Sequence, residues 1–165
     1  MNYLFAYIIY PIIYVFPAYA ANGAPVIFGG GSPLDFGRKL SGKRILGDNK
    51  TIRGTASALI AGTAVGLIEY PFMHYMLAIA VVLSIGTILG DLGGSFLKRQ
   101  MKVKSGASVP ILDQSGFVAI ALLLAYPFGH MPDAYGLLFI LVLTGIAHVL
   151  TNIGAHKLKL KKVPW

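Results

Sequence analysis

Five apolar segments follow one another along the chain, and polar or turn-forming stretches separate them. They run over roughly residues 3–21, 54–69, 72–96, 114–128 and 135–155. A membrane-spanning helix needs about 20 predominantly apolar residues, so this pattern predicts five transmembrane helices. The chain is therefore expected to be an all-α, polytopic integral membrane protein, with residues 1–165 forming a single domain.

One long irregular segment, residues 22–53, separates the first predicted helix from the second. It contains seven glycines, and a loop of this length in a compact protein is usually either functional or disordered. Apolar side chains such as Val26, Phe28, Phe36 and Leu46 argue against disorder. We therefore expect an ordered, functional loop.

Positive charge alternates with the apolar segments. Hydrophobic residues make up 56% of the chain and charged residues 12%, and the formal net charge is +8. All 14 Lys and Arg residues fall into three clusters, at 38–53, 98–104 and 157–162. Cytoplasmic loops carry the excess of Lys and Arg, which predicts an outside N-terminus and places these clusters and the C-terminus in the cytoplasm. Orientation and phosphate binding explain this charge better than a nucleic-acid partner does.

The third apolar segment carries a stripe of polar side chains. Its members recur at spacings of three and four residues, which puts them on one face of a helix: Ser84, Thr87, Asp91, Ser95 and Lys98. An acid inside a membrane span indicates a functional site by default. The alternative is an aspartate that is paired with a basic residue for structural reasons alone.

Two other patterns are more typical of helix packing than of chemistry. Gly86, Gly90 and Gly94 form a stripe of small residues, which allows a neighbouring helix to approach closely. His148 and Asn152 lie one turn apart in the fifth segment, and a polar seam between helices is favoured there over a ligand site.

Asp113 stands at the start of the fourth apolar segment, where two roles are open. Aspartate is a favoured N-cap residue, and its charge stabilises a helix N-terminus. Alternatively, Asp113 faces Asp91 and the two carboxylates bind Mg²⁺, a hard cation whose oxygen shell is often completed by substrate phosphates. One residue can fill both roles.

The long loop contains a stretch that nearly matches a phosphate-binding P-loop. Residues 37–44 read Gly-Arg-Lys-Leu-Ser-Gly-Lys-Arg, but the final Ser or Thr that should hold Mg²⁺ is missing and no strand precedes them. We reject a P-loop and retain the idea of glycine-rich backbone near phosphates. Residues 47–54 lead into the second helix, whose N-terminus favours phosphate. The alternative role for these cations is anchoring at the membrane surface.

At this point the chain resembles a known family. Residues 90–99, Gly-Asp-Leu-Gly-Gly-Ser-Phe-Leu-Lys-Arg, followed by Lys104 and Asp113, are similar to the signature of integral-membrane CDP-diglyceride synthases. Residues 50–54, Lys-Thr-Ile-Arg-Gly, resemble a second segment of that family. The short length and residues 22–25 and 33–37 resemble the archaeal branch, the CDP-archaeol synthases.

The resemblance implies a membrane enzyme that transfers CMP from CTP to an ether-lipid phosphate, 2,3-bis-O-geranylgeranylglycerol 1-phosphate, and releases pyrophosphate. It implies that Asp91 and Asp113 bind Mg²⁺ and that Lys98 acts with them in catalysis. It also implies a set of residues that contact the nucleotide and its phosphates: Asn22, Lys43, Lys50, Thr51, Arg53, Ser95, Arg99 and Lys104.

Two departures from the family pattern bear on the metal site. Ser105 stands where the bacterial pattern has an aspartate, and Gly116 stands where the family usually has a further acid. One Mg²⁺ bound by Asp91, Asp113 and triphosphate oxygens is therefore expected rather than two. The alternatives are a lipid kinase and a small anion transporter, and a pair of acids argues against the transporter because it would repel anions.

Overall fold

A computed structural model describes the backbone of residues 2–103 and 109–159, and side chains in these ranges except those of 110–114. A short π-helical turn, Phe5–Ile9, leads into the first α-helix. The five α-helices are α1 (Tyr10–Phe28), α2 (Ile52–Glu69), α3 (Met76–Gln100), α4 (Pro110–Ala125) and α5 (Ala134–Lys157). Strands β1 (Lys39–Leu40) and β2 (Lys43–Arg44) pair in the long loop, and a 3₁₀ turn, Tyr126–Phe128, follows α4.

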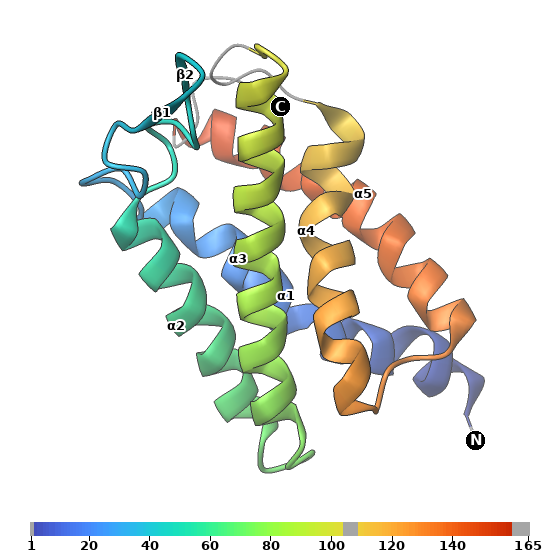
Figure 1. Cartoon of the computed structure of the whole chain (residues 1–165). Coiled ribbons are helices and arrows are strands. Elements are labelled where there is room, and N and C mark those ends of the chain that lie inside the picture. Colours follow the sequence, from blue (N-terminus) through green and yellow to red (C-terminus); the bar gives the residue numbers. More distant parts are fainter. Residues whose placement is uncertain (1, 104–108, 160–165) are drawn as a thin grey trace.

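The bundle is organised around α3, which packs against α1, α2 and α4 (Figure 1). Helix α5 packs against α1 and α4, on the other side of the molecule from α2. Large, fully buried side chains come from α1, α3, α4 and α5: Tyr14, Met76, Ile79, Leu83, Val118 and Ile140. The predicted all-α fold is confirmed.

Two helix boundaries differ from the sequence prediction. Helix α1 runs on to Phe28 instead of ending near residue 21, so the loop spans residues 29–51 instead of 22–53. Ala21 and Ala24 are buried, and a methyl group on Gly54 of α2 would lie 3.4 Å from the Cβ of Pro25. This tertiary packing sustains the last turns of α1 despite an internal proline. Likewise, α3 begins at Met76 and ends at Gln100, whereas the predicted segment covered roughly residues 72–96. Lys98 and Arg99 in its last turn complement the C-terminal helix dipole.

The N-cap interpretation of Asp113 is wrong. Helix α4 begins at Pro110 with Val109 at the N-cap position, so Asp113 lies within the helix. Proline is favoured at the first helical position because its fixed φ suits the helix and its missing N–H has no partner there. The same role is filled in α5 by Asp133, whose carboxylate accepts a hydrogen bond of 2.9 Å from the Gly136 amide.

Glycines on α3 allow α4 to approach its backbone directly. A methyl group on Gly86 would lie 2.5 Å from the Cα of Ala121, and one on Gly90 would lie 2.7 Å from the Cα of Phe117. On α2, a methyl group on Gly62 would lie 2.9 Å from the carbonyl oxygen of Pro17. Close backbone packing is what drives helix association in lipid, and the predicted role of Gly86 and Gly90 is confirmed.

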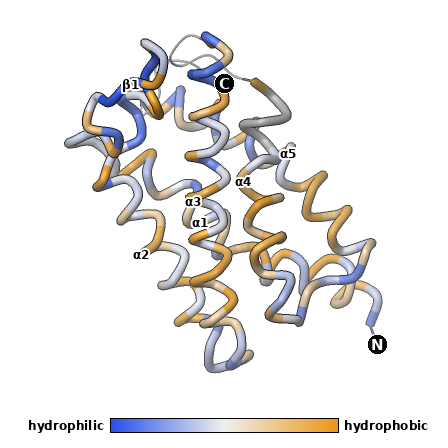
Figure 2. Tube along the Cα trace, in the orientation of Figure 1, coloured by the Kyte–Doolittle hydropathy of each residue, from blue (hydrophilic) through white to orange (hydrophobic). Residues whose placement is uncertain are grey.

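The two ends of the bundle differ in chemistry. The end that carries the hydrophilic 29–51 loop, called the basic end here, also includes the last turn of α3 (Figure 2). At the opposite, aromatic end the ring of Tyr75 stacks on His130 at 3.8 Å, and the Tyr10 hydroxyl hydrogen-bonds to the His130 carbonyl. Tyr7 and Tyr135 pack edge to face at 5.7 Å. Aromatic side chains of this kind are enriched where helices meet the membrane interface.

Three helical segments among the described residues are long and apolar enough to cross a membrane: Phe5–Phe28, Met76–Gln100 and Ala134–Lys157. Helix α2 has 18 residues, and the described apolar part of α4 with its 3₁₀ turn, Ser115–Phe128, is shorter than a typical span. The presence of five helices agrees with the sequence, whereas five complete crossings stay a prediction.

A polar seam joins α1 to α5 at the level of Tyr19. Its hydroxyl lies 2.8 Å from the Thr144 hydroxyl, which also donates 2.6 Å to the carbonyl of Ile140. Farther along α5, the Asn152 amide lies 3.0 Å from Nδ1 of His148, and Asn152 is buried. The Tyr19–Thr144 contact joins two helices, whereas the His148–Asn152 contact lies within α5, so a seam between helices at these two residues stays a prediction.

Gly86→Ala tests the packing of α3 against α4. The new methyl group meets backbone atoms of Ala121, which cannot yield without moving α4, so we expect a loss of about 1–3 kcal/mol in unfolding free energy. Thermal unfolding in detergent measures it. Gly93→Ala is the matched control on the same helix, because no described atom lies within 4 Å of its added Cβ. Equal stability of the two variants would contradict this packing.

Candidate functional site

The 29–51 loop is an ordered structure built on a two-strand hairpin. Lys39 pairs with Arg44 and Leu40 with Lys43, and Ser41 and Gly42 form the turn with φ of 50° and 78°. Positive φ at both central positions is typical of the tight turns that join antiparallel strands. The stretch that nearly matched a P-loop is therefore a β-hairpin, in agreement with its rejection above.

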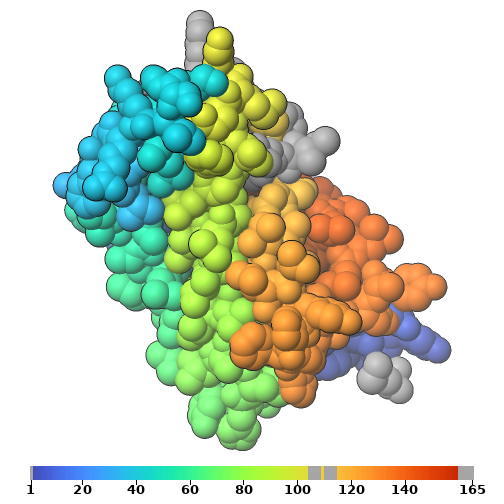
Figure 3. Space-filling model, viewed as in Figure 1, coloured from blue at the N-terminus to red at the C-terminus, as the bar shows by residue number. Residues whose placement is uncertain are grey.

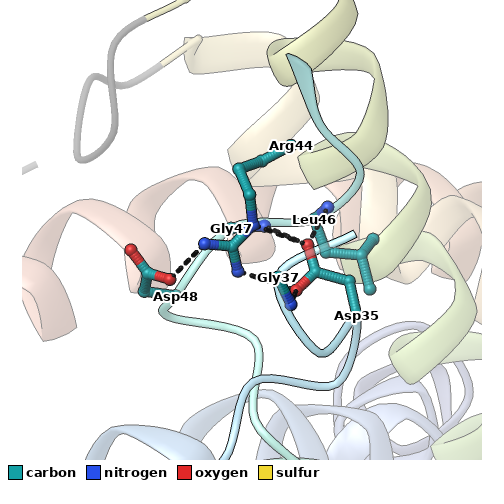
Figure 4. Close-up of polar contacts among 6 residues, drawn as sticks. All are labelled: Asp35, Gly37, Arg44, Leu46, Gly47 and Asp48. Atoms are coloured by element: carbon teal, nitrogen blue, oxygen red, sulfur yellow. Dashed lines mark hydrogen bonds and ion pairs between the residues drawn. The ribbon is translucent and has the colours of Figure 1, made fainter. Parts of the chain in front are cut away.

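A single carboxylate, that of Asp35, organises the interior of this loop (Figure 4). Its oxygens accept hydrogen bonds from the amides of Gly37, Leu46 and Gly47 at 3.1, 3.0 and 3.2 Å. They also accept from Nη2 and Nε of Arg44 at 2.7 and 3.2 Å. The side chain of Asp35 is 1% exposed, so the five hydrogen bonds satisfy a buried charge.

The hydrogen bonds from Arg44 hold the pKa of Asp35 well below the ordinary aspartate value, and the three backbone amides act in the same direction. Burial opposes this shift, but it is the smaller effect. Arg44 in turn donates 2.6 Å to Asp48, an exposed carboxylate, and both acids raise the pKa of the guanidinium. Asp35 is therefore ionised throughout the physiological pH range.

Two lysines attach the loop to α3. Nζ of Lys43 donates 2.7 Å to the carbonyl oxygen of Gln100, one of the unpaired carbonyls at the end of α3. Nζ of Lys50 lies 2.6 Å from both carboxylate oxygens of Asp91. In the space-filling view the loop lies directly against the end of α3 (Figure 3). The loop and α3 therefore form one continuous polar surface at the basic end.

Asp91 lies where the buried face of α3 meets solvent. Ser84, Thr87 and Ser95, which share its helical face, are all buried, whereas the Asp91 side chain is 40% exposed. Ser84 donates 2.6 Å to the carbonyl of Ala80, as hydroxyls in apolar helices commonly do. The Thr87 hydroxyl oxygen, in contrast, has no hydrogen-bond partner among the described residues although it is buried.

The other predicted site residues lie at the same end of the bundle, in several roles. Thr51 is the N-cap of α2, and its hydroxyl oxygen accepts 3.0 Å from the Gly54 amide. Arg53 is exposed in the first turn of α2, and Asn22 is half-buried within α1 instead of on the loop. Lys98 and Arg99 are partly exposed in the last turn of α3.

Two predicted residues fall outside this description. Lys104 lies outside the described residues, and so does the side chain of Asp113, whose backbone belongs to the beginning of α4. Helix α4 packs on α3, so the two acids belong to neighbouring helices, as expected. The role of Asp113 as a metal ligand stays a prediction.

The oxygen atoms of Asp91 and of the hydroxyl side chains on its helical face are chemically suited to bind Mg²⁺. Carboxylate and hydroxyl oxygens are the hard ligands that this ion prefers, and the unpartnered Thr87 hydroxyl suits a metal-bound water. Among the described residues, no three His, Cys, Asp or Glu side chains gather into a potential metal cage. A magnesium site that substrate phosphates complete therefore stays a prediction.

No role for Asp35 and Asp48 could be predicted from the sequence pattern. Both stand in irregular backbone, where no periodicity relates them to a partner. The available signal was their composition: two acids lie within a segment of six basic residues, where each has an opposite charge nearby. That signal predicts ion pairs but does not say which cation each acid will bind.

Fold and site together define a class: a membrane-embedded helical enzyme with a polar, phosphate-compatible site at one end of its bundle. A family model described as "CarS-like: CDP-archaeol synthase" matches residues 4–165. A protein of Pyrococcus horikoshii named CDP-archaeol synthase is 47% identical over 160 residues, which cover 92% of this chain and 94% of that protein. The CDP-archaeol synthase of Methanopyrus kandleri is 44% identical, with 92% and 90% covered.

A solved structure described as an intramembrane enzyme for archaeal membrane lipids biosynthesis superposes on this fold. Its TM-score is 0.81 at 32% sequence identity, and the match covers 86% of this chain and 92% of the other. The chain belongs to the CDP-archaeol synthase family.

Asp35→Asn tests the buried charge of the loop. A neutral amide cannot accept all five hydrogen bonds, so hydrogen exchange at Leu46 and Gly47 should become about tenfold faster or more. Asp48→Asn is the control, since Asp48 is exposed and surface pairs contribute little.

The same contact sets a pH dependence in the wild-type protein. Because the folded pKa of Asp35 lies below the unfolded one, its stabilisation is complete above about pH 4 and is lost as the pH falls further. Protection at the two amides, corrected for intrinsic exchange, should decline in that range. Unchanged protection of the Leu46 and Gly47 amides in the Asp35→Asn variant would contradict the role of Asp35 in organising the loop.

Proposed function

We propose that this protein transfers CMP from CTP to 2,3-bis-O-geranylgeranylglycerol 1-phosphate at the basic end of its bundle, with Mg²⁺ as the metal ion. Family membership makes the protein a membrane cytidylyltransferase that produces CDP-archaeol. The identity of the nucleotide, the metal and the roles of the residues below are the parts that we propose. The supporting observation is that loop 29–51 brings Lys50 to Asp91 beside the last turn of α3.

The reaction requires positioning and charge neutralisation more than covalent chemistry by the protein. An oxygen of the lipid phosphate attacks the α-phosphorus of CTP, and the bond to the β-phosphate oxygen breaks as pyrophosphate leaves. Lys98 and Arg99 lie in the last turn of α3, where their charges can bind and orient the phosphates. Lys50 and Arg53 supply further positive charge from the loop and the start of α2.

Asp91 and Asp113 are the residues that would hold Mg²⁺. When bound, this ion neutralises charge on triphosphate oxygens and on the departing pyrophosphate. Thr51 shapes the nucleotide side indirectly, since its hydroxyl caps α2 and thereby fixes the backbone next to Lys50. Ser95 is buried one turn beyond Asp91, on the same face of α3. Lys43 is engaged with the Gln100 carbonyl, and we assign it to holding the loop in place.

Labelled CTP distinguishes this function from the lipid kinase. Purified protein with Mg²⁺ and the lipid phosphate should move ³²P from the α position of CTP into lipid, whereas a kinase would move it from the γ position. We expect Asp91→Asn to lower the transfer rate at least tenfold, about 1.4 kcal/mol, while Lys39→Ala on the exposed face of the hairpin leaves it unchanged. Label entering lipid from the γ position, or full activity of Asp91→Asn, would overturn the assignment.

The proposed site needs the basic end to face the cytoplasm, where CTP is available. The chain has no cysteine, so single cysteines at Ser41 in the hairpin turn and at Phe72 between α2 and α3 report on the two ends. Both positions are exposed. An impermeant maleimide added to intact cells should label only position 72, and position 41 should react once the cells are opened. Labelling of position 41 from outside would contradict the orientation.

A further inference from the structure

The contact between Lys50 and Asp91 places a cation where a metal ion would bind. Nζ of Lys50 lies 2.6 Å from each oxygen of the carboxylate, so a single ammonium group contacts both metal-ligand atoms. The two side chains are 25% and 40% exposed, which leaves a path for exchange with solvent. In this arrangement the ammonium group stands in for the cation of the loaded site.

Backbone hydrogen bonds hold Lys50 on both sides, and its side chain extends from this segment to Asp91. The Lys50 carbonyl accepts 2.7 Å from the Leu34 amide, and its own amide donates 3.3 Å to the Gly47 carbonyl. The next residue, Thr51, forms a bridge to Pro33 and caps α2. A lysine side chain is a point charge on a flexible stem of four carbons. On a backbone held in this way, its ammonium group can move from one anion to another without movement of the loop.

Several other contacts also hold the loop in place. Lys43 already ties the hairpin to Gln100, and the buried Asp35 network and the Pro33–Thr51 bridge shape the rest. An ion pair exposed to this degree contributes little to stability. The static role in this loop belongs to Arg44, whose planar guanidinium makes a two-bond contact with the buried Asp35. A flexible lysine side chain beside a carboxylate that is proposed to bind metal suits a different role.

We propose that Lys50 is an internal counter-cation, which occupies Asp91 in the nucleotide-free protein and moves to the CTP phosphates when metal and nucleotide bind together. This proposal rests on the function proposed above. A metal ion arriving alone must displace the ammonium group or lie next to it, and both are electrostatically unfavourable. A triphosphate that arrives with the metal gives Lys50 a new anionic partner, so the metal binds tightly only with its nucleotide.

Metal binding to the nucleotide-free protein tests this proposal without relying on turnover. Mn²⁺ is the probe, and electron paramagnetic resonance measures the free ion in solutions of purified protein in detergent. Lys50→Met removes the charge and keeps most of the length of the side chain. We expect this variant to bind Mn²⁺ at least tenfold more tightly than the wild type without CTP, about 1.4 kcal/mol. The added Asp91→Asn substitution should abolish the gain.

Three controls isolate the effect of the Lys50 charge. Lys39→Met removes an equal charge from an exposed position in the same loop and should leave Mn²⁺ affinity as in the wild type. Lys50→Arg keeps a cation beside Asp91 and should also bind Mn²⁺ weakly. Lys50→Gln repeats the neutralisation with another side chain and replaces Lys50→Met if that variant fails to fold.

The effect of CTP separates the possible failures. Added CTP should tighten Mn²⁺ binding strongly in the wild type and much less in Lys50→Met, which has already lost the competing charge. Equal Mn²⁺ affinity of wild type and Lys50→Met without CTP would overturn the counter-cation role, even if CMP transfer proceeds normally. Absence of CMP transfer in the labelled assay would instead overturn the proposed function.

Discussion

An ion pair between residues 41 positions apart joins the irregular loop to the central helix, and the candidate site depends on it. Lys50 reaches Asp91 because a buried carboxylate, Asp35, gives the loop a defined shape by accepting hydrogen bonds from its backbone amides. The loop in turn rests on α3 through Lys43. The Lys50 contact joins two opposite charges and the Lys43 contact joins a charge to the C-terminal end of α3, at the end of the bundle where both lysines are partly exposed.

The remainder of the bundle packs in the way that helices do in lipid. Apolar burial does not drive helices together in lipid, so the structure relies on close backbone contact at Gly62, Gly86 and Gly90 and on hydroxyl contacts such as that between Tyr19 and Thr144. In this packing α3 lies between α1, α2 and α4. The stripe of polar residues on α3 is therefore presented at a fixed depth below the loop.

Much of this arrangement could be predicted from periodicity alone. The lengths of the apolar segments gave five helices, and spacings of three and four residues put Asp91 and its buried neighbours on one face. The partners in the loop had no such signal, because irregular backbone does not relate Asp35 to Arg44 by any repeat. Boundaries were missed where local preference competes with packing, as at the end of α1, and where Pro110 starts α4 ahead of Asp113.

The central claim is that one cation serves two anionic partners in turn, Asp91 in the resting protein and phosphate in the loaded one. Experimental structures of the same preparation, determined without ligands and with CTP and Mg²⁺, test this claim most directly. The account predicts Lys50 Nζ within hydrogen-bond distance of Asp91 in the first structure. In the second, Nζ should contact a phosphate oxygen while Asp91 contacts the metal ion. A Lys50–Asp91 pair that persists in the loaded structure, or is missing from the unloaded one, would contradict it.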